Sequence, residues 1–124
     1  MTLKRDENIV RAVCSDKFDG MRLSPSLFAG SNTSVSRLSL ISLENHWELF
    51  RRHVQKPPHR TLERIAEINV GQLEDVGGNH NPPTQLSVEE DPLAWNQAHA
   101  IIPQKISRGL ANAILKKLAV HKSD

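Results

Sequence analysis

Residues 34–70 read SVSRLSLISLENHWELFRRHVQKPPHRTLERIAEINV, and this stretch decides the fold class. Its centre has large apolar side chains spaced so that they share one face of an α-helix: Leu43, Trp47, Phe50 and Val54. Ser42, just before them, is a favoured N-cap residue, and Glu44 lies in the first turn, where a carboxylate stabilises the helix dipole. Pro57-Pro58 ends the helix, because proline interrupts the helical hydrogen bonds. We predict an amphipathic helix over about 43–55.

In the segments on either side of this helix, successive side chains fall alternately into two sets, which would lie on the two faces of a half-buried strand. The alternation predicts one short strand over 35–41 and a second over 62–70. The connection through residues 57–61 is long enough for two geometries. The two strands either run parallel in a βαβ unit or belong to a mainly antiparallel sheet.

The rest of the chain has shorter signals. Residues 9–14 form an apolar run too short to distinguish strand from helix, and residues 86–89 and 100–102 are strand candidates. We expect residues 1–8 to be flexible and residues 15–34 and 76–85 to form long loops. A second amphipathic helix, about 104–120, follows from the spacing of Ile106, Leu110, Ala113, Ile114 and Leu118.

Together these elements predict an α+β fold in one domain, residues 1–124. We expect a small, mainly antiparallel sheet of about four short strands, packed against the two amphipathic helices over about 43–55 and 104–120.

The charges of the chain nearly cancel, with 16 Lys and Arg against 14 Asp and Glu. They are nevertheless segregated: residues 1–60 carry a net charge of +4, residues 61–95 of −6 and residues 96–124 of +4. A uniformly basic nucleic-acid-binding protein does not have this pattern. A protein with differently charged faces, or with an acidic edge that meets a partner or a second copy of the chain, does.

Several classes of site are disfavoured by composition. Cys14 is the single cysteine, which excludes an internal disulfide and any zinc site needing two thiolates, and we expect no disulfide-linked partner. His46 and His53 lie two helical turns apart, about 10.5 Å, which is too far to share one ion. We therefore expect no metal site and no cofactor. No apolar run approaches the length of about 18 residues that a membrane span needs, and the first ten residues lack the apolar core of a secretion signal, so we expect a cytoplasmic protein without a membrane partner.

One cluster has groups suited to acid–base or metal chemistry, namely Glu89, Asp91 and His99. It supports a small metal-assisted hydrolase or nuclease as one alternative. Against it, neighbouring carboxylates on a strand point to opposite faces. No Gly-x-Ser-x-Gly elbow and no phosphate-binding loop occurs, so we expect no catalytic residues.

Two basic clusters support another alternative, a nucleic-acid-binding component that contacts phosphates. The first lies around the two prolines and the second near the C-terminus: Arg51, Arg52 and Arg60, and Lys105, Arg108, Lys116 and Lys117. They would form one patch only if the fold placed them together. The chain has only five aromatic residues, so platforms on which bases can stack are scarce.

Trp95 is the one aromatic residue without a place in an apolar stripe. It lies in an irregular segment that also contains His99, and tryptophan is a frequent anchor at protein interfaces. We expect a non-catalytic accessory or adaptor protein that binds a protein partner or associates with itself. The predicted contact residues are Trp95 and His99, with a basic side of Arg51, Arg52 and Lys56.

Overall fold

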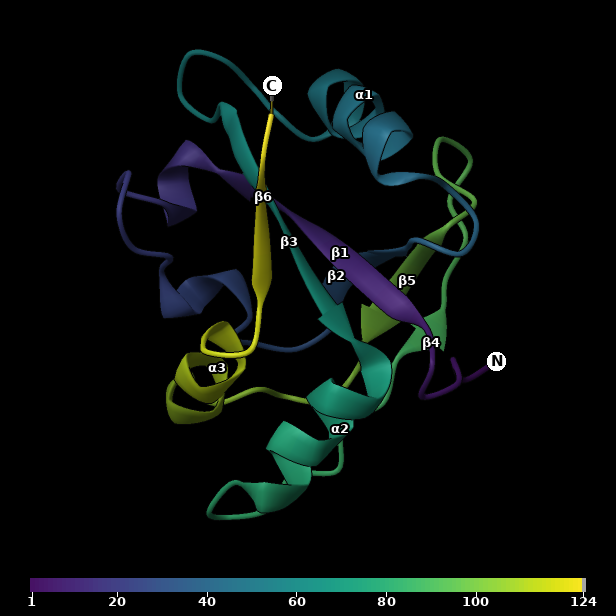
Figure 1. The fold of residues 1–124 in the computed structure, drawn as a ribbon, viewed down its shortest axis with the longest axis vertical. Coiled ribbons are helices and arrows are strands. Elements are labelled where there is room, and N and C mark those ends of the chain that lie inside the picture. The colour runs from purple at the N-terminus through teal and green to yellow at the C-terminus, as the bar shows by residue number, and fades with distance from the viewer. Residues whose placement is uncertain (124) are drawn as a thin grey trace.

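The computed structural model describes residues 1–123, and within them one antiparallel sheet of six strands forms the centre of the fold (Figure 1). The order of the strands across the sheet is β4-β5-β2-β1-β3-β6. Their bounds are β1 Asn8–Cys14, β2 Thr33–Arg37, β3 Leu62–Asn69, β4 Glu89–Glu90, β5 His99–Ile102 and β6 Ala119–Lys122. The α+β class and the antiparallel sheet are confirmed, whereas the expected number of strands, about four, was too low.

The strand β1 lies in the middle of the sheet, between β2 and β3, and pairs antiparallel with both. Consequently β2 and β3 run in the same direction with β1 between them, and the helix α1 (Leu43–His53) connects them. This arrangement is a split βαβ unit, so both geometries that the sequence left open are present. The parallel relation holds for β2 and β3, while every hydrogen-bonded pair is antiparallel.

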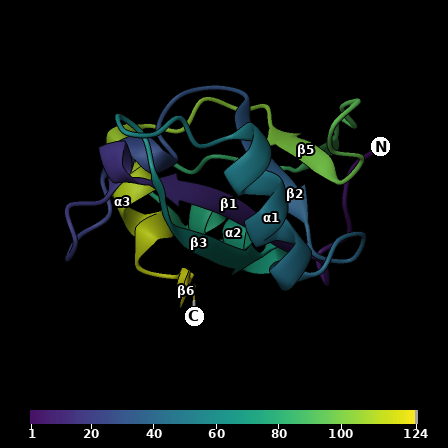
Figure 2. The same ribbon diagram turned by 90° about the horizontal axis from the view of Figure 1, so that it is seen from above.

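The helix α1 covers one face of the sheet (Figure 2). The Ser42 side chain accepts a hydrogen bond from the Asn45 amide at 3.1 Å, which confirms the predicted N-cap. Phe50 is buried against Val10 of β1 and Ile65 of β3. The other residues of the predicted apolar face are partly buried around this small cluster: Leu43, Trp47 and Val54.

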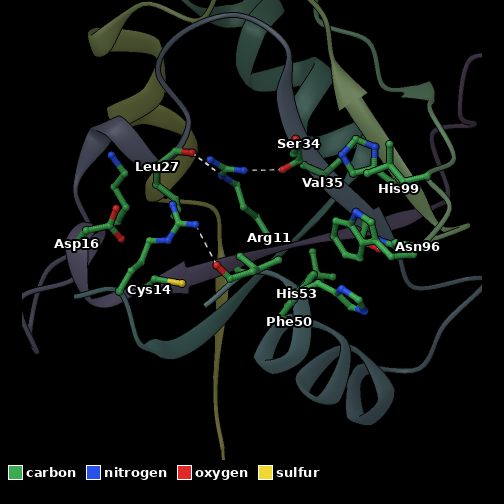
Figure 3. Close-up of a pocket in the computed structure, with 18 residues that line it drawn as sticks. Arg11, Cys14, Asp16, Leu27, Ser34, Val35, Phe50, His53, Asn96 and His99 are labelled. Atoms are coloured by element: carbon green, nitrogen blue, oxygen red, sulfur yellow. Dashed lines mark hydrogen bonds between the residues drawn. The ribbon is translucent and has the colours of Figure 1, made fainter. Parts of the chain in front are cut away.

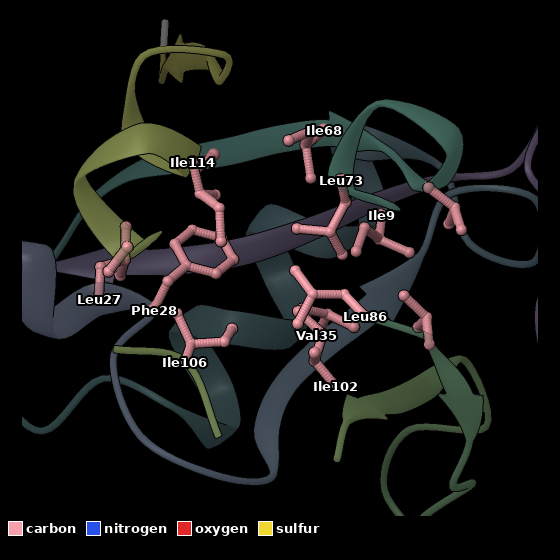
Figure 4. Close-up of a cluster of buried hydrophobic side chains, with 14 of the residues drawn as sticks. Ile9, Leu27, Phe28, Val35, Ile68, Leu73, Leu86, Ile102, Ile106 and Ile114 are labelled. Atoms are coloured by element: carbon pink, nitrogen blue, oxygen red, sulfur yellow. The ribbon is translucent and has the colours of Figure 1, made fainter. Parts of the chain in front are cut away.

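The opposite face is covered by α2 (Val70–Asn79) and α3 (Arg108–Leu115), and the main core lies beneath them (Figure 4). The sequence did not predict α2, and residues 76–79 of the expected loop 76–85 belong to it. Its three glycines give the segment a low helix propensity. The helix is stabilised instead by the Asn69 side chain, which accepts from the Gln72 amide at 3.1 Å, and by the burial of Val70 and Leu73.

The predicted helix 104–120 was too long. Ser107 caps α3, because its side chain accepts from the Leu110 amide at 3.1 Å, and the helix ends at Leu115. Residues 119–122 then form β6 along the free edge of β3, whose backbone groups need hydrogen-bond partners. Lys116 and Lys117 therefore follow the helix rather than lie within its last turns.

The segments expected to be flexible or irregular are tied to the sheet. In residues 1–8, Leu3 is buried and its amide donates to the Val88 carbonyl at 2.8 Å. Residues 15–34 contain two 3₁₀ turns, η1 Ser15–Lys17 and η2 Pro25–Leu27, and their last two residues begin β2. Leu27 and Phe28 are buried in the main core. No helix within residues 1–123 is both long and apolar enough to cross a membrane.

Candidate binding cleft

A cleft of about 320 Å³ opens on the α1 side of the sheet, where β1 and β2 separate (Figure 3). The two strands pair only through Ile9 with Arg37 and Val10 with Ser36. Beyond these pairs the strands diverge, and the cleft lies between them, the C-terminal end of α1 and the loop over residues 91–98. Its volume lies at the lower end of the range for sites that bind small molecules or single side chains.

Arg11 is the one charged residue of β1, with apolar residues on both sides, and its guanidinium spans the gap between β1 and β2 (Figure 3). Its Nε donates to the Leu27 carbonyl at 2.6 Å and its Nη1 to the Ser34 carbonyl at 2.7 Å. No carboxylate of residues 1–123 forms an ion pair with it. Burial lowers the pKa of Arg11, but arginine remains protonated in proteins, so the cleft contains a positive charge without a direct counter-ion.

Arg60 contributes a second guanidinium to the cleft. Its Nη2 donates to the Val54 carbonyl at the end of α1, at 3.0 Å. Its Nε is buried without a hydrogen-bond partner, the one side-chain atom of residues 1–123 in that condition. Lys17 and Asp16 also line the cleft, so three cationic side chains face one carboxylate.

Cys14 lies on the same wall as these charges. Burial raises the pKa of its thiol, although the nearby charge of Arg60 acts in the opposite direction. The thiol therefore stays protonated at neutral pH, in which form it is a poor nucleophile. It is free and buried.

Aromatic rings form the mouth of the cleft. The Trp95 ring stacks on the His53 ring of α1, with the centroids 4.9 Å apart and the planes at 24°. Trp95 is 37% exposed, which makes it one of the few large hydrophobic side chains on the described surface. Phe50 and Val54 also line the cleft, so apolar side chains accompany the two guanidinium groups.

A buried polar network joins β2, α1 and the 91–98 loop behind the cleft. His46 Nδ1 lies 2.9 Å from the Ser42 carbonyl and therefore donates to it, which leaves Nε2 to accept from Ser36 Oγ at 2.6 Å. Asn96 Nδ2 donates to the same oxygen at 3.1 Å. A serine beside a histidine base is the pairing of many hydrolases. Here, however, Ser36 is only 1% exposed, and its hydroxyl is already engaged in both directions.

His99 also lies in the wall of the cleft, and it is buried. Its Nδ1 lies 2.8 Å from the Asp91 carbonyl and 3.2 Å from the Asp91 carboxylate. Glu89, the third residue of the hydrolase alternative, accepts from the Thr2 hydroxyl instead. No group of three or more His, Cys, Asp and Glu side chains in residues 1–123 is arranged to hold a metal ion. Of the three residues of the predicted acid–base cluster, Asp91 and His99 are therefore in contact, whereas the Glu89 carboxylate binds Thr2.

The predicted basic contact residues lie at the C-terminal end of α1. The Arg51 guanidinium lies 5.4 Å from the centroid of the Trp47 ring and donates to the Ser123 hydroxyl at 2.8 Å. Arg52 and Lys56 are exposed, and they flank the stretch that carries His53.

The second basic cluster is separate from the first. Lys105, Arg108, Lys116 and Lys117 surround α3, which packs on the other face of the sheet. The two basic clusters therefore do not form one patch, because α1 and α3 are divided by the sheet.

Much of the acidic segment, residues 61–95, is neutralised within the chain. Glu74 and Asp75 bind Arg5, at 2.9 and 3.0 Å, and Glu90 binds Arg37 at 2.9 Å. Glu67 lies 2.8 Å from His121 Nε2. The alternation of charge along the sequence thus reflects contacts between distant segments as well as the character of the surface.

No protein-family model, curated protein or solved structure matches this chain.

The predicted contact residues Trp95 and His99 both line the cleft, and whether they contact a partner stays a prediction. The sequence gives no sign that His53 and Arg60 lie beside them, since both belong to a cluster around the two prolines that is distant in the chain from Trp95. Arg11 carried a usable signal, because a lone arginine inside an apolar run must find hydrogen-bond partners once that run is buried. The sequence contains no such signal for Ser36 and Asn96, because they are ordinary polar residues that only the tertiary structure brings together.

Proposed function

We propose that this protein is a non-catalytic adaptor that binds a protein partner through the mouth of the cleft. The observation that carries the proposal is the exposed Trp95 ring, stacked on His53 beside the exposed Arg52 and Lys56. Tryptophan and arginine are enriched among the residues that dominate binding energy at interfaces. A basic rim beside such an anchor favours a partner with a complementary acidic surface.

The rigidity of the surface also supports binding. Trp95 belongs to the 91–98 loop, which the Asn96 hydrogen bond to Ser36 attaches to β2, while the His46 hydrogen bond attaches α1 to the same serine. The two elements that carry the stacked rings are thus held to one strand. A surface that is ordered before it binds loses less entropy when the partner arrives.

Site-specific photo-crosslinking tests this proposal. A benzophenone amino acid replaces Trp95 in the full chain, and the control places it at Val120 on β6, which is similarly exposed at 43%. In the native host, position 95 should give a discrete protein adduct that position 120 does not give. The adduct should weaken in a second variant carrying Arg52→Glu and Lys56→Glu.

Three results would separate this proposal from its alternatives. An adduct of twice the chain mass, with concentration-dependent sedimentation of the purified protein, identifies self-association as the form of binding. Equal adduct patterns from positions 95 and 120 refute the proposed surface. Tight, steeply salt-dependent binding of a DNA or RNA oligonucleotide to the purified chain, with no protein adduct, supports the nucleic-acid alternative instead.

A further inference from the structure

We propose that the cleft is a carboxylate site, which binds an apolar group bearing a carboxylate between the two guanidinium groups and the aromatic wall. This inference rests on the proposed function, because it names the chemistry that the same cleft accepts. The carboxylate would meet Arg11 and Arg60, and the apolar group would lie against Phe50 and the Trp95 ring.

The cleft contains two guanidinium groups that form no ion pair within residues 1–123. The Nε and Nη1 atoms of Arg11 donate to backbone carbonyls. Its Nη2 makes no hydrogen bond within residues 1–123 and is not fully buried. Arg60 Nη1 likewise makes no hydrogen bond within residues 1–123 and is not fully buried, whereas the partnerless Nε of the same group is enclosed by protein. Neither guanidinium forms an ion pair with a carboxylate of residues 1–123, although the Asp16 side chain lines the same cleft. A carboxylate bound in the cleft would supply a counter-charge for both guanidinium groups and acceptors for their open Nη atoms.

Both guanidinium groups are held in fixed positions by hydrogen bonds to the backbone. Each guanidinium is anchored by a backbone carbonyl, so its remaining N–H groups already point in set directions. The planar fork of arginine matches the two oxygens of a carboxylate. Binding therefore requires little loss of side-chain freedom, which favours even a small ligand.

The rest of the cleft suits an apolar group with one negative charge. One wall is apolar and aromatic, and the volume of about 320 Å³ suits a group of the size of a phenylalanine side chain with its carboxylate. Asp16, which also lines the cleft, lowers its net positive charge and so favours a single negative charge over a dianion. Such a group occurs at the C-terminus of a peptide and in a free carboxylic acid.

Binding of N-acetyl-phenylalanine to the purified full chain, followed by calorimetry and by amide chemical shifts, tests the inference. The free acid should bind with a Kd of about 1 mM or below, and its uncharged amide at least tenfold more weakly. Arg60→Gln should weaken binding of the acid about tenfold or more, the effect of losing one charge-assisted hydrogen bond. Arg64→Gln is the matched control, since Arg64 lies on β3 over the Phe18 ring and does not line the cleft.

Arg11→Lys provides a second variant that keeps the charge while removing the fork, and it should also weaken the acid if its thermal unfolding remains cooperative. A short peptide ending in phenylalanine, compared with the same peptide amidated, distinguishes the two sources. Preference for the peptide indicates a protein C-terminus, and equal affinity indicates that the acid itself is sufficient. Inorganic phosphate should bind more weakly than the acid.

The inference fails if acid and amide bind equally, if neither binds at 10-fold the expected Kd, or if Arg64→Gln weakens binding as much as Arg60→Gln. Its failure is distinct from that of the proposed function. A specific adduct from position 95 without binding of the acid leaves the adaptor and refutes the carboxylate site. Binding of the acid without any adduct supports the carboxylate site and refutes the proposed adaptor.

Discussion

Alanine at Gly77 and alanine at Gly78 should change the stability of this protein in opposite directions, although the two glycines are adjacent in α2. Gly77 is buried, and a Cβ there would collide with the Thr84 carbonyl oxygen and lie 3.0 and 3.1 Å from Leu86 side-chain carbons. The Thr84 amide also donates to the Gly77 carbonyl at 2.9 Å, so the backbone of this loop has little room to retreat. At Gly78, a Cβ meets nothing within 4 Å.

The magnitudes follow from two opposing effects. Replacing glycine by alanine in a helix is favourable by about 0.5–1 kcal/mol, because alanine loses less backbone entropy on folding. Forcing a methyl group into a packed contact costs about 1–3 kcal/mol. Gly78→Ala should therefore stabilise the fold by about 0.5 kcal/mol, whereas Gly77→Ala should destabilise it by about 0.5–2 kcal/mol. For a chain of this size the second change lowers Tm by about 2–8 °C.

Urea denaturation of both variants, followed by far-ultraviolet circular dichroism and tryptophan fluorescence, measures the two free energies of unfolding. The reasoning is refuted if the two variants shift the midpoint in the same direction by the same amount. That result would mean that residues 84–86 do not pack against the last turn of α2.

Three further expectations concern the α1 side of the sheet and the N-terminal segment. Phe50→Ala should lower the free energy of unfolding by about 3 kcal/mol or more, because the ring is buried between the sheet and α1. Trp95→Ala should lower it by under about 1 kcal/mol, because that ring is more than a third exposed. Parallel urea titrations of the two variants compare these values. Burial lowers the pKa of His46, so below about pH 6.5 the unfolded chain binds this proton first and stability should fall; His46→Gln should flatten that part of a pH-dependent unfolding curve. The hydrogen bond from Arg37 lowers the pKa of Glu7, so its contribution is present above the unfolded pKa of about 4.5 and is lost as the pH falls through the lower folded value. Glu7→Gln should accordingly cost about 1 kcal/mol at pH 7 and progressively less in acid, as measured by thermal unfolding.

The elements that could be predicted are those with strong local signals. For α1, the N-cap, the apolar stripe and the terminating prolines all lie within the helix or next to it. The strand β3 was recognised from its alternation, because each of its faces meets a different layer of the fold. These signals depend only on neighbours in the chain, so they survive without knowledge of the tertiary structure.

The elements that were missed are stabilised by distant parts of the chain. The glycine-rich α2 has little intrinsic preference for a helix, and burial of Val70 and Leu73 in the main core outweighs that deficit. Likewise, β6 reads as the end of an amphipathic helix, and it becomes a strand because the edge of β3 lies within reach.

The same division applies to the candidate site. The sequence by itself determined that the chain contains an amphipathic helix between two strands, an α+β fold, and an unassigned tryptophan near a buried strand. Only the tertiary structure decided that Arg11 and Arg60, which are far apart in the chain, share one cleft with Trp95 and His53, and that the two basic clusters lie on opposite faces of the sheet. The physical reason is that helix and strand signals are local, whereas a cleft forms where strands diverge, and that divergence is set by packing across the whole sheet.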